Sequence, residues 1–188
     1  MASNPNSSDR LVPADWTIQL ADAIAASLRE FALQLQGCEV VLLQVICLPW
    51  YRLLGLAILT AEELAEDASL ADPMRTMDWR YGEFTEEVEA WRLTTPLAQE
   101  MRAAYYGSSD CPAAALEFLR ACASAAATAK VVEAVSLLER AEGFRVSVPH
   151  PDDRREFFPI GLEPFTAVDG GQTPPKLKNP RGRKKARD

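Results

Sequence analysis

The chain has 188 residues, of which 48% are hydrophobic and 25% are charged, and its net charge at pH 7 is −7. These values are ordinary for a folded protein and exclude a largely disordered chain; the length suits one domain with a buried core. Residues 1–10 are expected to be a flexible N-terminus. Their polar composition lacks the basic and apolar regions of a secretory signal, so no such signal is predicted.

The charge is distributed unevenly along the chain. Residues 176–188 contain seven Lys or Arg and one Asp, a net +6, which leaves −13 on residues 1–175. This asymmetry is typical of a folded body with a polyanion-binding arm. A solvated tail without a partner and a nuclear import signal are the alternatives. As a nucleic-acid-binding tail it would contact phosphates of RNA or DNA through Lys176, Lys178, Arg181, Arg183, Lys184, Lys185 and Arg187.

The first predicted element is an amphipathic helix. Apolar residues recur at helical spacing from Trp16 to Leu35, Asp15 is a candidate N-cap, and Gly37 is a natural stop. Residues 39–48 are apolar nearly all round and are predicted as a short enclosed helix. A further helix is predicted from Pro49 or Trp50 to about Asp67, so that the two form a mid-chain helical hairpin.

The apolar run over residues 40–59 is interrupted by Gln44, Pro49 and Arg52, so we predict core helices there and no membrane span. Residues 68–82 are expected to be a connector. Further helices are predicted over residues 84–93, 95–106 and 112–142, and the small side chains of residues 121–129 suit a tight helix crossing. A short extended segment is predicted over residues 144–148. The prediction is therefore an all-α helical domain over residues 11–148.

From Pro149 onward, regularly spaced prolines forbid a helix and favour an extended arm over residues 149–175. Phe157, Phe158 and Ile160 lie in it, and a disordered linker seldom holds so many large apolar groups. The arm should therefore dock on its own domain or on a neighbouring subunit.

No catalytic or metal-binding constellation is evident in the sequence. Cys38, Cys47, Cys111 and Cys122 form no CxxC pair and are predicted to be buried free thiols, with an intermolecular disulfide as the alternative. The single histidine, His150, lies between two prolines of the arm. Phosphate-binding loops, nucleophile elbows and zinc-ligand spacings are missing from the sequence, so no enzyme activity, metal or cofactor is predicted.

Four segments carry a resemblance to a known family. They are Val12-Pro-Ala-Asp-Trp16, Val131-Val-Glu-Ala-Val135, Glu156-Phe-Phe-Pro-Ile160 and the start of the tail, Pro180-Arg-Gly-Arg-Lys-Lys185. Their order along the chain resembles that in the capsid (core) protein of hepatitis B-like viruses and their non-enveloped fish relatives, the nackednaviruses. The likeness spans most of the chain at the level of pattern.

This resemblance implies a capsid protein that assembles in two stages. Helical hairpins of two protomers would pair into a four-helix bundle, with Leu53, Leu56, Ala57 and Leu64 in the homodimer interface. Dimers would then close an icosahedral shell through Phe157, Phe158 and Ile160 and package RNA through the tail. The localisations implied are the virion, the host cytoplasm and the nucleus.

A second hypothesis needs no resemblance. The chain would be a non-enzymatic helical adaptor, of phage or nuclear origin, whose tail serves for nucleic-acid binding or nuclear import. It predicts a discrete monomer or dimer, whereas the capsid hypothesis predicts large homo-oligomers. The acidic body suits both hypotheses, because it repels polyanions and leaves attraction to the tail.

Overall fold

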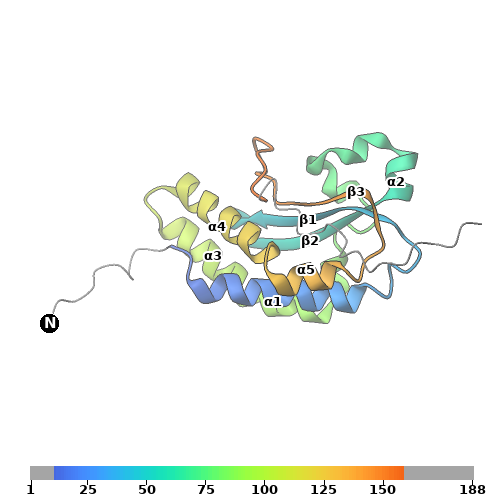
Figure 1. Cartoon of the computed structure of the whole chain (residues 1–188). Coiled ribbons are helices and arrows are strands. Elements are labelled where there is room, and N and C mark those ends of the chain that lie inside the picture. Colours follow the sequence, from blue (N-terminus) through green and yellow to red (C-terminus); the bar gives the residue numbers. More distant parts are fainter. Residues whose placement is uncertain (1–10, 159–188) are drawn as a thin grey trace, which may run out of the picture.

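The computed structural model describes residues 11–158, which form a mixed α/β fold (Figure 1). Three strands make one sheet in the order β2-β1-β3, and helices pack against it. The prediction of an all-α domain is therefore wrong. The regular elements are α1 (Ala14–Phe31), β1 (Val40–Leu48), β2 (Leu53–Thr60), α2 (Ala61–Glu66), α3 (Thr95–Gly107), α4 (Cys111–Ala126), α5 (Ala129–Val135) and β3 (Arg140–Ser147).

The predicted mid-chain helical hairpin is a β-hairpin. β1 and β2 pair antiparallel from Leu48↔Leu53 to Val40↔Thr60, around a short 3-10 turn, η1 (Pro49–Tyr51). A continuous apolar run fits a strand that is buried on both faces as well as it fits an enclosed helix, so its periodicity does not separate the two. Without a helical hairpin, the predicted four-helix bundle cannot form.

Other elements also differ from the bounds predicted for them. The first helix begins at Ala14, so Asp15 lies inside it and is not its N-cap. The helix predicted over residues 84–93 is a pair of 3-10 turns, η4 (Phe84–Glu87) and η5 (Glu89–Thr94). The long helix predicted over residues 112–142 is divided into α4, α5 and the start of β3. The helix expected to end near Tyr106 is confirmed as α3.

One face of the sheet supports the main core. α1, α4 and α5 lie along this face (Figure 1), and the large apolar side chains of α1 and α4 meet those of the strands there. Trp16 links helix α1 to α4 and α3 within this core. Its ring packs edge-on against Phe118, with centroids 5.2 Å apart, and its indole Nε1 donates to the Leu97 carbonyl oxygen at 3.1 Å.

The segment from α2 through two further 3-10 turns, η2 (Ala68–Ala71) and η3 (Pro73–Asp78), forms a flap over the second face. Leu42, Ala57 and Leu59 from the sheet pack there against Leu70 and Trp79 of the flap region. The Trp79 indole Nε1 also donates to the Leu70 carbonyl oxygen at 3.0 Å. The two faces therefore give the sheet a main core and a smaller second core.

The outer edge of β2 is partly covered. The Ile58 amide donates to the Tyr81 carbonyl oxygen at 3.2 Å, and the Trp91 indole donates to the Leu54 carbonyl oxygen at 3.2 Å. Such cover protects an edge strand against pairing with another chain. β3 lies on the other side of β1 and pairs with it in parallel, with Leu42 opposite Arg145.

The segment after β3 belongs to the folded domain. Phe158 is 7% exposed and packs in the main core, and Phe157 packs against that core. The Glu156 carboxylate accepts hydrogen bonds from the backbone amides of Val148, Phe157 and Phe158, which folds residues 148–158 back on themselves. The domain thus extends beyond the predicted limit at residue 148.

Within residues 11–158, the helices are too short or too polar to cross a bilayer.

Candidate functional site

An aromatic–arginine surface lies at the end of the sheet where β1 turns into β2. It consists of Trp50 and Tyr51 of η1, the adjoining Arg52, and Arg102, Tyr105 and Tyr106 from the second half of α3. η1 and α3 are in direct contact. The Tyr106 hydroxyl donates to the Trp50 carbonyl oxygen at 3.4 Å, which links the two elements within this surface.

The four aromatic rings of this surface form a connected chain. Ring centroids are 6.2 Å apart for Trp50 and Tyr51, 5.9 Å for Trp50 and Tyr105, and 5.1 Å for Tyr105 and Tyr106. Trp50 and Tyr105 are half-buried, whereas Tyr51 is 74% exposed and Tyr106 is 61% exposed. The inner rings therefore fix the positions of the outer ones, and the outer rings offer apolar area to solvent.

Arg52 is held at the surface by its backbone. Its φ of 55° lies in the left-handed region, and its amide donates to the Pro49 carbonyl oxygen at 3.1 Å to close the turn. A residue other than glycine is uncommon in this region. The arginine residue is exposed.

Between the turn and the helix is an open hollow of about 340 Å³. Its lining residues are Arg52, Gln99, Arg102, Ala103 and Tyr106. None of these carries a carboxylate, and two carry guanidinium groups. The Arg102 guanidinium also lies over the Tyr106 ring, 5.6 Å from its centroid, in a cation–π arrangement. The hollow therefore combines positive charge with an aromatic face.

These two arginines differ from most cations of the domain. Residues 11–158 contain twelve Lys and Arg side chains, and seven of them form ion pairs with carboxylates: Arg29, Arg75, Arg80, Arg92, Lys130, Arg154 and Arg155. Within the described residues, neither Arg52 nor Arg102 forms an ion pair. An unpaired guanidinium in an acidic domain is available to an anionic ligand.

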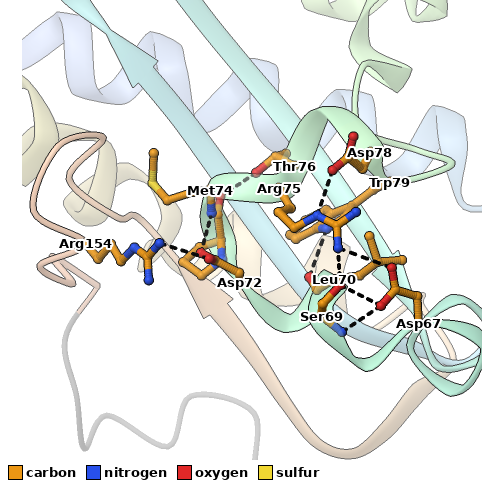
Figure 2. Close-up of polar contacts among 11 residues, drawn as sticks. Asp67, Ser69, Leu70, Asp72, Met74, Arg75, Thr76, Asp78, Trp79 and Arg154 are labelled. Atoms are coloured by element: carbon orange, nitrogen blue, oxygen red, sulfur yellow. Dashed lines mark hydrogen bonds and ion pairs between the residues drawn. The ribbon is translucent and has the colours of Figure 1, made fainter.

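The flap over the second face of the sheet is acidic and internally paired, as Figure 2 shows. Arg75 contacts Ser69 and pairs with Asp67 at 3.2 Å and Asp78 at 2.8 Å. The hydrogen bond to Asp78 is the main reason that the pKa of Arg75 is raised above its ordinary value. Arg154 joins the segment after β3 to the flap through Asp72 at 3.0 Å. These contacts satisfy the charges of the flap and indicate a structural role.

Carboxylates are also present near the aromatic–arginine surface: Glu100 precedes Arg102 by two residues on α3, and Asp152 lies near Tyr105. The pKa of the Tyr105 phenol is raised, first by desolvation and then by the neighbouring Cys111, Tyr106 and Asp152. Asp152 thus lies within electrostatic reach of the inner side of the surface. It is not among the residues that line the hollow.

The residues predicted for subunit contacts differ in their exposure to solvent. Leu56 and Ala57 are each 0% exposed, in the main and the second core respectively, so they cannot face a partner as predicted. Leu53 is 43% exposed, and Leu64 is half-buried and packs against the second core. Phe158 is buried in its own chain, which is contrary to its predicted role as an anchor in a neighbour. Ile160 and the seven basic tail residues lie outside the described range.

His150 and the four cysteines, for which no catalytic role was predicted, have structural surroundings. His150 Nδ1 accepts hydrogen bonds from the amides of Asp152 and Asp153, so it stabilises a turn. Cys47 and Cys122 are buried free thiols, as predicted, and Cys38 and Cys111 are half-buried. Residues 11–158 contain no group of three His, Cys, Asp or Glu side chains that could hold a metal ion.

Sequence reasoning missed the aromatic–arginine surface. Its signal is present as two short runs, Trp50-Tyr-Arg52 and Arg102-Ala-Ala-Tyr-Tyr106. Interpreting Pro49–Tyr51 as the start of a helix hid a turn that brings the first run against the second. Comparison of the chain with protein-family models, with curated proteins and with solved structures found no match.

Proposed function

We propose that this protein is a non-enzymatic adaptor that attaches its acidic α/β body to nucleic acid through the basic tail, residues 176–188. The observation that carries the proposal is the division of charge, +6 on the tail against −13 on residues 1–175. Lys and Arg on a terminal segment neutralise phosphates without reading bases, so this binding is sensitive to salt and indifferent to sequence.

The acidic body supports the assignment of binding to the tail. Residues 11–158 contain 23 Asp or Glu and 12 Lys or Arg, a net charge of −11. Such a body repels a polyanion at long range. Initial attraction then falls to the tail, which is the one strongly basic stretch of the sequence.

The capsid hypothesis receives less support from the geometry. Its dimer depended on a helical hairpin, and residues 40–60 form a β-hairpin instead. An adaptor requires no such bundle, because each molecule works with its own body and tail. We accordingly expect a monomer or small oligomer, and large particles in light scattering across a range of salt would favour the capsid hypothesis.

Fluorescence anisotropy with a 20-nucleotide single-stranded RNA tests the proposal. Three proteins are compared: the full chain, residues 1–175, and a full chain whose seven tail Lys and Arg residues are replaced by Gln. Both altered proteins are expected to bind at least about tenfold more weakly at low salt. The glutamine variant separates loss of charge from loss of length. Unchanged affinity in both altered proteins would refute the proposal.

A further inference from the structure

We propose that the aromatic–arginine surface is a second contact for the nucleic acid, which takes one or two unpaired bases and their phosphates. The inference rests on the proposed function and deepens it. The tail would hold phosphates without regard to bases, whereas this surface would require the base itself.

The exposed rings provide the stacking component. Tyr51 and Tyr106 have 74% and 61% of their surface exposed and are supported from below by Trp50 and Tyr105. A planar ring held in this way gives a face on which any base can stack. Because base faces are inaccessible in a duplex, the surface suits a single strand.

The arginines provide the phosphate component. Arg52 and Arg102 both line the hollow beside Tyr106, and neither forms an ion pair within the described part of the chain. The distance of 5.6 Å between the Arg102 guanidinium and the Tyr106 ring centroid places positive charge next to a stacking face. A nucleotide has the same pairing of a flat ring and an anionic group. The chemistry of the hollow is thus complementary to it.

The placement of acidic residues permits this contact despite the negative body. Glu62, Glu63 and Glu66 lie in α2, which follows the far end of β2, whereas Arg52 precedes its near end. Eight strand residues separate the two by about 26 Å, beyond about two Debye lengths at physiological salt. Figure 1 shows α2 and the α3–α4 region at opposite ends of the sheet. Asp152, near Tyr105, and Glu100, two residues before Arg102 on α3, are carboxylates that oppose binding locally.

The size of the hollow limits the ligand. About 340 Å³ is near the lower end of ordinary ligand pockets, so the hollow itself has room for about one nucleotide. Affinity from so few contacts is weak alone. Because the tail would already hold the same strand, the surface would act at a raised effective concentration.

The test compares an intact 20-nucleotide RNA with an abasic strand of the same length and charge, using the full chain. Binding of the intact strand is expected to be about tenfold tighter, which is the effect of one stacked base. Two double variants, Tyr51→Ala with Tyr106→Ala and Arg52→Gln with Arg102→Gln, should lose most of this preference. Leu93→Ala and Arg120→Gln are matched controls, because they remove exposed apolar area or positive charge elsewhere.

Trp50 gives a second readout at the site. Trp16, Trp79 and Trp91 are 1%, 4% and 7% exposed, so Trp50 is the one tryptophan that solvent reaches readily. Short oligonucleotides should therefore quench the fluorescence of the 1–175 protein, and the double variants should weaken the quenching. Circular dichroism melting checks that each variant is folded.

Equal affinity of the full chain for intact and abasic strands would overturn this inference and leave the tail proposal standing. Base preference that survives both double variants would also overturn it. A poly-glutamate peptide that quenches Trp50 when RNA does not would assign the surface to an acidic protein segment instead. Conversely, if removal of the tail changes nothing while base preference persists, the proposed function fails and this site remains.

Discussion

Glu63 shows how a single buried carboxylate organises backbone from two elements. It is 5% exposed and accepts hydrogen bonds from the amide and hydroxyl of Thr60, which caps α2, and from the Arg80 amide beyond the flap. Together with the bond from the Glu63 amide back to Thr60, these contacts form a capping box. Its neighbour Glu62 is exposed and pairs with the Arg80 side chain at 2.8 Å.

We therefore predict that Glu63→Ala lowers the free energy of unfolding by about 2–3 kcal/mol, because it leaves buried donors without an acceptor. Glu62→Ala is the matched control and should cost less than about 1 kcal/mol, as exposed ion pairs do. Urea denaturation followed by circular dichroism measures both. Equal losses for the two variants would contradict this account of Glu63.

A sulfur cluster lies in the main core. The Cys47 thiol contacts the Met101 sulfur at 3.6 Å, and a hydrogen bond with Cys47 and burial raise the pKa of the Cys122 thiol well above its ordinary 9.0. A raised pKa means that the folded state favours the protonated thiol. This contribution to stability is complete below pH 9 and is lost above it, because the unfolded chain alone can then ionise Cys122.

The corresponding prediction concerns thiol reactivity. At pH 8 a thiol reagent should label no more than two cysteines of the native protein, the half-buried Cys38 and Cys111, and all four after denaturation. The melting temperature of wild type should also fall more steeply above pH 9 than that of Cys122→Ala. Rapid labelling of all four thiols in the native protein would contradict the burial of Cys47 and Cys122.

At the scale of elements, the flap depends on one close approach of backbone. A Cβ added at Gly82 would lie 2.2 Å from the Thr76 carbonyl oxygen, a distance that real contacts do not reach. Gly82 therefore lets the chain leave η3 and return to the edge of β2 at Tyr81. At Gly107, the last residue of α3, an added Cβ would meet nothing within 4 Å.

Gly82→Ala is accordingly expected to destabilise the protein by about 2 kcal/mol or more, because the flap must shift away from the sheet. Gly107→Ala should change the stability by less than about 0.5 kcal/mol. Thermal melts of the two variants compare them directly. A stable Gly82→Ala protein, with Trp79 still shielded from quencher, would show that the flap is not so tightly placed.

The sequence predicted elements well where polar residues broke the apolar pattern. The stripe from Trp16 to Leu35 and the proline–glycine limits of residues 95–107 led to α1 and α3. The run over residues 40–59 has no such pattern, because both faces of β1 and β2 are largely buried. Its helix or strand character is decided by contacts with residues far along the chain. The parallel pairing of β3 with β1 is a contact of this kind.

At the scale of the whole molecule, two separate parts of the chain are proposed to bind nucleic acid: the basic tail and the aromatic–arginine surface. The basic tail was evident from composition alone, because charge runs need no fold to be recognised. The aromatic–arginine surface was not, because residues 50–52 and 102–106 meet only through the turn between β1 and β2 and its packing on α3. The acidic helix α2, where the flap begins, lies at the other end of the sheet (Figure 1).

The most direct test of the central claim, that the tail attaches the body to nucleic acid, is the salt dependence of the full chain's affinity for single-stranded RNA. Each phosphate contact contributes about −0.7 to the slope of log affinity against log salt, so the seven tail cations contribute about −5 and the full chain should show a slope at least that steep. Residues 1–175, with two unpaired arginines at the surface, should give no more than about −1.5. Equal slopes for the two proteins would contradict the account.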